Sequence, residues 1–135
     1  MSPIVRGARI GFRVGAWIFV ACVIVQVFLA GVGVFSNQAD FTLHRQWGYT
    51  FGWLAIILLV LAIVGRLPRR AVWGSVLLIV LFTMQSVFVA MRESAPLVAA
   101  LHPVNALAIF LLSIWLARSA AAWVSPPPTP AAGAV

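Results

Sequence analysis

The chain has two histidines, and each stands where a polar segment meets a long apolar one. His44 lies within residues 40–52, and His102 lies within residues 101–106. A neutral imidazole on each of two bundle helices is what bis-histidine ligation of a haem iron requires, with one Nε2 on either side of the metal. The pair therefore predicts a haem site with His44 and His102 as iron ligands, provided that the fold turns the two rings toward each other.

Composition determines which elements position these rings. Of 135 residues, 64% are hydrophobic and only 8% are charged, and the mean hydropathy is +1.11, whereas roughly 25% of the residues of a soluble domain are charged. The uncharged segments each reach the ~20 residues that cross a bilayer as a helix; they are 14–39, 46–65, 71–91 and 94–117. The sequence therefore predicts an integral membrane protein rather than a soluble one.

We expect an all-α fold, an antiparallel bundle of four transmembrane helices in one domain. The domain covers residues 1–124, and the proline-rich stretch 125–135 is predicted to be a disordered tail. The four helices are expected at about 14–36, 42–65, 71–91 and 101–123.

The arginines predict the orientation of the bundle. Seven of them fall on one side of a four-span topology, while the charges of Asp40, Arg45, Arg92 and Glu93 cancel on the other side. The positive-inside rule then places both termini in the cytoplasm, in the inner membrane of a bacterial cell, with the histidines near the outer face. Because topology accounts for the net charge of +7, the expected partner is the lipid bilayer and not nucleic acid. A homo-oligomer is compatible with this pattern.

A polar stripe on the first helix includes Gln26. At helical spacing it shares a face with Cys22, Ala30, Gly33 and Asn37, which we expect to face the bundle. The opposite stripe is expected to face lipid; it contains Phe19, Val23, Val27 and Val34. Gln26 has two interpretations, a hydrogen bonder that joins helices or a polar contact of the haem site. Cys22 is the only cysteine, so the chain forms no internal disulfide.

Gly48 and Gly52 follow His44 on the same face of the second helix. Such a pair commonly permits close helix packing, but small residues beneath a histidine would also leave room for a flat ligand. Both interpretations stay open. The neighbouring Trp47, Tyr49 and Trp53 are typical of an interfacial aromatic belt.

The third and fourth helices add further polar groups near the same outer cavity. Gln85 lies at a depth similar to that of Gln26, and Asn105 shares one side of the last helix with His102. Pro103 either occupies the first position of that helix or kinks a helix that begins at Ala95. The outer loop between the two helices is expected to carry a helical turn near Pro96.

Two sequence stretches carry a resemblance to known families. The run Gln26-Val-Phe-Leu-Ala-Gly-Val-Gly, followed by His44 and later by Leu-His102-Pro-Val-Asn-Ala, resembles a family of small, uncharacterised four-helix bacterial membrane proteins. The layout is also similar to one half-bundle of haem A synthase, in which a His-Arg pair opens the second helix and a histidine opens the fourth. That resemblance implies one low-spin, six-coordinate haem b near the outer face. It does not imply haem O oxidation, because the second half-bundle is missing.

The remaining candidates follow from these residues. Arg45 would pair with a haem propionate or balance Asp40. A metal site of Asp40, His44 and His102 is an alternative.

The sequence shows no set of a nucleophile and a base, so an enzyme acting on its own is not predicted. A haem protein would serve electron transfer or haem handling, with a redox partner, a quinol or a larger membrane complex. The other reading is an accessory or scaffolding subunit without a cofactor.

Overall fold

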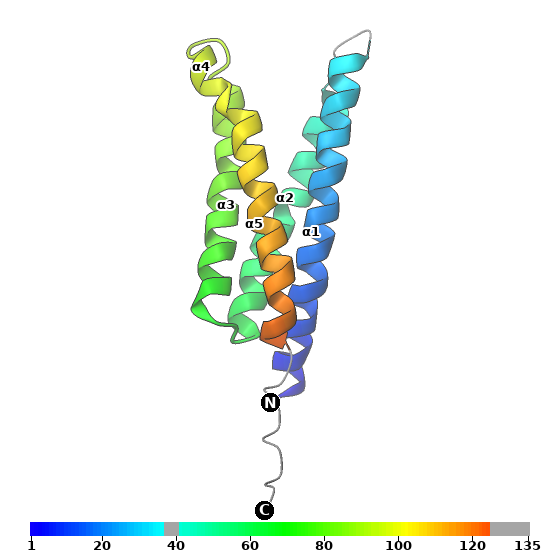
Figure 1. The fold of residues 1–135 in the computed structure, drawn as a ribbon, viewed down its shortest axis with the longest axis vertical. Helices are drawn as coiled ribbons and strands as arrows, with labels where there is room; N and C mark the ends of the chain where they lie inside the picture. The colour runs from blue at the N-terminus through cyan, green and yellow to red at the C-terminus, as the bar shows by residue number, and fades with distance from the viewer. Residues whose placement is uncertain (37–40, 125–135) are drawn as a thin grey trace, which may run out of the picture.

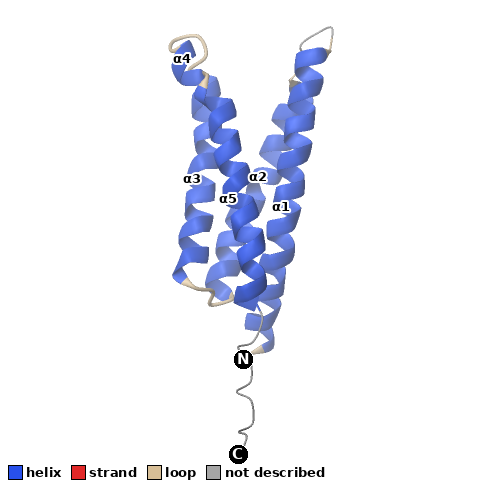
Figure 2. Ribbon diagram, viewed as in Figure 1, coloured by secondary structure: helices blue, strands red, loops and turns tan. Residues whose placement is uncertain are grey.

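The computed structural model describes residues 1–36 and 41–124, and these residues form helices and turns only. Figures 1 and 2 show the helices, which are α1 (Pro3–Phe35), α2 (Thr42–Val64), α3 (Arg69–Ala90), α4 (Pro96–Ala99) and α5 (Leu101–Val124). Counting α4 together with α5, four helices are long and apolar enough to cross a membrane. The predicted all-α, four-helix fold is confirmed. The predicted tail lies outside the described residues.

Helix α1 begins well before residue 14, where the sequence predicted its start. Pro3 occupies the first turn, and the Ser2 hydroxyl accepts a hydrogen bond from the Val5 amide at 3.3 Å. Both features favour a helix start at this point. Arginine is also a good helix former, so the basic residues after Pro3 mark where the apolar segment begins and not where the helix begins.

The helices form a square in which each long helix packs against two neighbours. Helices α1 and α3 both pack against α2 and α5, so α2 and α5 lie on one diagonal of the square. At the end that holds the α2–α3 turn, the helices lie close together, and we call this the closed end. Toward the opposite, open end, the α1–α2 hairpin and the α3–α5 hairpin diverge as two arms (Figure 1).

An aromatic cluster fills the bundle where the arms join. Phe19, Phe51 and Phe82 contact one another edge to face, with ring centroids 5.2–6.1 Å apart. Phe19 is fully buried and Val23 is only 4% exposed, which corrects the prediction that both face lipid. The reason is that α1 packs against two helices, so its buried face is wider than one stripe. Val27 and Val34 are exposed, as expected.

Arg9 joins three elements at the closed end. Its Nε donates to the Gly65 carbonyl at 2.8 Å, Nη1 donates to the Trp123 carbonyl at 3.4 Å, and Nη2 donates to the Arg66 carbonyl at 3.4 Å. The ends of α2 and α5 carry partial negative charge, which favours a cation there. The sequence treated every arginine at this end as a topology signal, so this structural role was missed.

We expect Arg9→Ala to destabilise the protein by about 1.5–3 kcal/mol, because the change removes a charged donor from carbonyls at two helix ends. Thermal unfolding of the detergent-purified protein measures the effect. Arg13→Ala is the matched control, because Arg13 is exposed on the same helix. Equal melting temperatures for the two variants would contradict a structural role for Arg9.

The connection between α3 and α5 contains the predicted turn, but α5 begins differently from either expectation. Helix α4 is a single turn that ends at Ala99, and α5 starts afresh at Leu101. Pro103 is therefore neither the first helical residue nor a kink within a long helix. It is the third residue of α5, where the missing amide would have no partner within the helix in any case.

Candidate functional site

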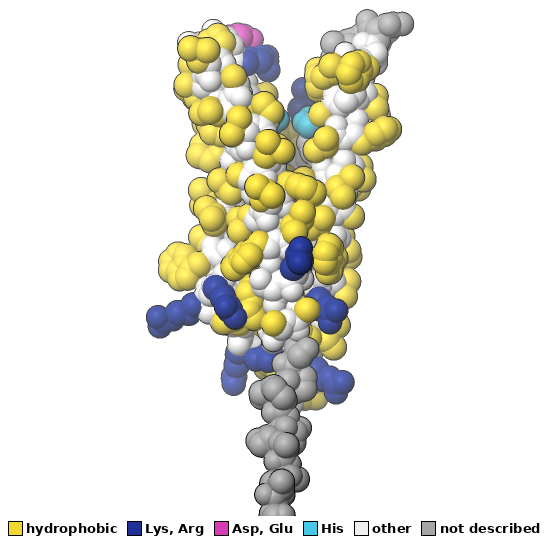
Figure 3. Space-filling view, in the orientation of Figure 1, with side chains coloured by type: hydrophobic (Ala, Val, Ile, Leu, Met, Phe, Trp, Pro, Cys, Tyr) yellow, Lys and Arg dark blue, Asp and Glu magenta, His cyan; other side chains and the backbone are white. Residues whose placement is uncertain are grey.

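His44 and His102 face each other across the open end of the bundle. Their ring centroids are 6.3 Å apart and their planes are inclined by 60°. His44 comes from α2 and His102 from α5, the two helices on the diagonal, and both side chains are half-buried. Figure 3 shows histidine side chains in the notch between the two arms. The predicted pair is thus brought together.

Both ring nitrogens of His44 are bonded to Gln26 of α1. His44 Nδ1 lies 3.1 Å from the Gln26 backbone oxygen, and His44 Nε2 lies 3.1 Å from Gln26 Nε2. A carbonyl oxygen only accepts, so Nδ1 carries the proton of the neutral ring. His44 Nε2 is therefore the lone-pair nitrogen and accepts from the Gln26 amide. Gln26 both joins two helices and contacts the candidate ligand, so the two interpretations of this residue coexist.

His102 is oriented in the same way by α3. Its Nδ1 donates to the Gln85 backbone oxygen at 3.2 Å, which leaves Nε2 as the lone-pair nitrogen. The side chain of Gln85 accepts from Asn105 Nδ2 at 2.9 Å, and the same nitrogen donates to the Leu81 carbonyl at 2.8 Å. Within the described residues, no hydrogen bond reaches His102 Nε2. Gln85 and Asn105 thus hold the backbone that orients His102.

The two arms repeat one arrangement. In each hairpin, the backbone carbonyl of a glutamine on the first helix accepts Nδ1–H of a histidine on the second helix. The pairs are Gln26 with His44 and Gln85 with His102. A hydrogen bond at Nδ1 fixes the tautomer and directs Nε2 toward a ligand, as in many metal sites. The two halves of the chain therefore share one local arrangement of a glutamine and a histidine.

The two glycines below His44 accommodate neighbouring side chains. A methyl group on Gly48 would lie 3.1 Å from Gln26 Nε2, and one on Gly52 would lie 2.7 Å from the Phe82 ring of α3. Protein side chains therefore fill the spaces beside both residues. This geometry favours the close-packing interpretation of the pair over open room for a flat ligand.

We expect Gly52→Ala to destabilise the bundle by about 1–3 kcal/mol, because the added methyl overlaps the Phe82 ring. Gly31→Ala is the control, since a methyl group there meets nothing within 4 Å. It should stabilise the helix by up to about 1 kcal/mol through helix propensity. Thermal unfolding checks both, and a neutral Gly52→Ala would show that Phe82 moves aside easily.

Arg45 is exposed next to His44, and no ion pair involves it within the described part of the chain. Its predicted partner Asp40 lies outside the described residues, so the structure describes only the two histidines of the predicted metal site of Asp40, His44 and His102. Among residues 1–36 and 41–124, no group of three or more His, Cys, Asp or Glu side chains could hold a metal ion. The two imidazoles are therefore the metal-binding groups to be considered.

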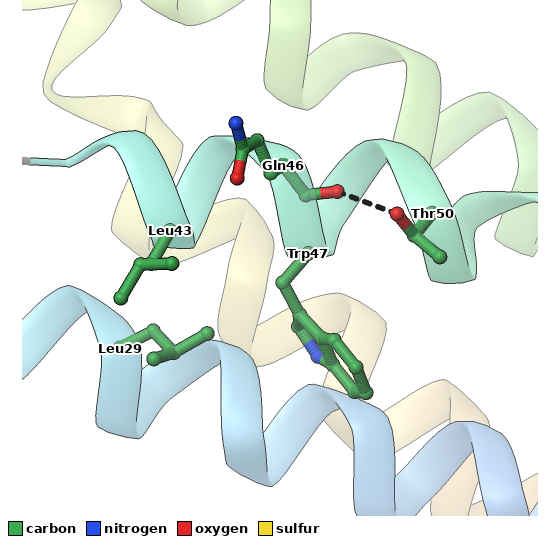
Figure 4. Close-up of a pocket in the computed structure, with 5 residues that line it drawn as sticks. All are labelled: Leu29, Leu43, Gln46, Trp47 and Thr50. Carbon is green, nitrogen blue, oxygen red and sulfur yellow. Dashed lines mark hydrogen bonds between the residues drawn. The ribbon is translucent and has the colours of Figure 1, made fainter.

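Two shallow surface hollows are lined by residues other than the two histidines. The first, of about 210 Å³, lies between α1 and α2 and is shown in Figure 4. Its Thr50 hydroxyl donates to the Gln46 carbonyl at 2.8 Å, so this polar group is already satisfied. The second, of about 430 Å³, lies between α3 and α5 and is mainly apolar. Neither hollow combines groups that could perform acid–base or nucleophilic chemistry.

Three aromatic residues near the site were not predicted to contact it. Phe41 packs over Gly33 and meets the His44 ring edge to face at 6.1 Å. Trp47 is half-buried, and its Nε1 donates to the Cys22 carbonyl at 3.0 Å, so it joins α1 to α2 instead of acting only as an interfacial anchor. Phe82 covers Gly52. Two of these rings, Phe41 and Phe82, pack over glycines, and glycines in the helices were the sequence feature that could have indicated such contacts.

The separation of the rings suits a single metal ion between them. A metal–imidazole bond is ~2.0–2.1 Å long and the nitrogen lies about 1 Å from the ring centre, so two imidazoles on one ion have centroids about 6 Å apart. The observed 6.3 Å matches this value. Both Nε2 atoms carry the lone pair that binds metals, so His44 and His102 could hold one metal ion between them once His44 Nε2 is released from the Gln26 amide.

Comparison with known proteins identified one family. No curated protein and no solved structure matched the chain significantly. Residues 26–92 match the model of DUF6220, a family of unknown function. The match extends from Gln26 through His44 to Arg92, and so covers the α1–α2 half of the site and the glutamine of α3. Over these residues, the chain is similar to DUF6220, a family of unknown function.

Proposed function

We propose that this protein is a membrane-bound b-type haem protein whose iron is held by His44 and His102. One observation carries the proposal: each arm presents a histidine with its Nδ1 bonded to a backbone carbonyl, and the two rings lie 6.3 Å apart across the bundle. Binding of one iron between the arms would give both imidazoles a common role.

The number of ligands favours haem over a bare metal ion. Structural zinc takes four protein ligands, whereas the described residues supply two imidazoles and no third group in a cluster. Haem brings its own equatorial nitrogens and requires only axial ligands from the protein. When bound, it would supply one-electron redox chemistry.

Other residues would serve the same site from the protein side. The aromatic cluster around Phe82 provides an apolar floor where the arms join, and Arg45 is an exposed cation beside His44 that suits a propionate. Gln85 and Asn105 would keep the His102 ring in place through the hydrogen bonds described above.

We further propose that the four helices span the bacterial inner membrane with both termini in the cytoplasm. Figure 3 shows the basic side chains gathered mainly toward the closed end, and exposed apolar side chains cover the rest of the visible surface. The positive-inside rule assigns the closed end to the cytoplasm. The histidines then lie near the outer face, where a redox partner, a quinol or a haem carrier would reach them, and electron transfer or haem handling follows as the role.

The test is the visible absorption of detergent-purified protein from haem-supplied cells, oxidised and then reduced with dithionite. We expect a Soret band with sharp α and β bands in the reduced form, which report low-spin, six-coordinate iron. The double variant His44→Ala/His102→Ala is the control and should be colourless. A wild-type protein that is colourless and takes up no added haemin would overturn the proposal and favour a cofactor-free accessory subunit.

A further inference from the structure

We infer that the two histidines bind iron in a fixed order, His102 first and His44 second, and that Gln26 is the positioning residue that delays the second step. The inference rests on the proposed function, and its experiment separates the failure of one from the failure of the other. It starts from an asymmetry between two histidines that are otherwise held alike.

The asymmetry lies at the two Nε2 atoms, which would be the iron-binding atoms. His44 Nε2 accepts a hydrogen bond from Gln26 Nε2 at 3.1 Å. His102 Nε2 has no such partner within the described residues. His102 can therefore bind a metal without giving up a contact, whereas His44 must first leave the Gln26 amide.

The Gln26 amide packs against Gly48 of α2. Gly48 leaves the space, since a methyl group there would lie 3.1 Å from Gln26 Nε2. The amide gains little else from this position, because Gln26 Oε1 is buried and has no hydrogen-bond partner within the described part of the chain. An unpaired buried oxygen is unfavourable. The Gln26 amide thus occupies the position at His44 Nε2 that the iron would take. Replacing the amide by the iron breaks only one neutral hydrogen bond.

This arrangement has a consequence for how the site is used. His44 can leave the iron and accept the Gln26 hydrogen bond again, so six-coordination would be reversible. His102 would stay bound to the iron throughout. Reversible ligation on one side suits haem that is taken up and passed on, or an iron that opens one position to a small ligand.

The experiment is stopped-flow mixing of haemin with the full-length protein in detergent, followed in the Soret region. In the wild type we expect two phases, a first phase of five-coordinate binding and a slower one that yields the low-spin spectrum. In Gln26→Leu the second phase should be roughly 2- to 10-fold faster, the equivalent of one neutral hydrogen bond. Gln46→Leu is the matched control, since Gln46 is exposed on α2, and it should behave as the wild type.

Each outcome of this experiment tests either the binding order or the haem proposal itself. A single phase in the wild type, or an unchanged second phase in Gln26→Leu, would overturn the binding order while leaving the haem proposal in place. Failure of the wild type to bind haemin would remove both. Gln26→Ala gives the same readout if the leucine variant does not fold.

Discussion

Replacing either histidine by alanine is expected to abolish the low-spin haem spectrum, and the two losses should differ in kind. His102→Ala removes the ligand whose Nε2 is open within the described residues, so haem uptake should be lost. His44→Ala keeps that ligand and should retain five-coordinate, high-spin haem with weakened affinity. Changes to groups that only support metal ligands typically cost ~10–100-fold in affinity, so loss of His102 itself should exceed that range.

Haemin titration with absorption spectra of both variants measures these effects. Tyr49→Phe is a suitable control, because Tyr49 is exposed on the same helix as His44, and it should bind haemin as the wild type does. If either histidine variant keeps the sharp reduced α band, that histidine is not an iron ligand. Equal behaviour of the two variants would contradict the asymmetry between their Nε2 atoms.

The common depth of the two histidines was predictable because it depends on topology alone, whereas the facing of their rings is a result of the fold. In a four-span bundle the second and fourth spans enter from the same side, so two histidines near the starts of these spans must share one depth. The same argument placed Gln26 and Gln85 at a common depth. Sequence does not specify which atom of a glutamine is used, and here the backbone carbonyl orients each imidazole.

The sequence was less informative where one pattern serves two purposes. Gly48 and Gly52 are compatible with a ligand space and with close packing, and only the positions of Gln26 and Phe82 distinguish the two. Arg9 is identical in type to the arginines that define topology, but its side chain donates to carbonyls at the ends of α2 and α5. Such differences arise from the angle at which a helix faces its neighbours, which composition does not specify.

The side of α1 that faces the bundle is the clearest case of a feature that the sequence pattern did not specify. Polar and small residues predicted one stripe, yet Phe19 is fully buried against Phe51 and Phe82, while Phe28 on the same helix is 68% exposed. Phenylalanine suits both lipid and a bundle interior, because lipid tails are as apolar as the core. Hydrophobicity therefore cannot distinguish these two positions, whereas packing does.

This difference leads to a large expected effect. Phe19→Ala should destabilise the bundle by about 3 kcal/mol, the lower end of the range for Phe→Ala in protein cores. The lower end applies because, in detergent as in lipid, the variant loses packing and gains a cavity but loses no transfer from water. Phe28→Ala removes the same atoms from an exposed position and should leave stability nearly unchanged. Thermal unfolding in detergent compares the two.

Phe19 also connects the stability of the bundle to the histidine site. The cluster of Phe19, Phe51 and Phe82 lies where the two arms join, so its loss should loosen the arms relative to each other and weaken haemin binding together with folding. Comparing Phe19→Ala with Arg9→Ala distinguishes the two ends, since Arg9 acts at the closed end. If both variants lowered the melting temperature but only Phe19→Ala lowered haemin affinity, the aromatic cluster would set the spacing between the imidazoles. Equal haemin affinity in the two variants would instead show that the hydrogen bonds within each arm are sufficient to hold the rings.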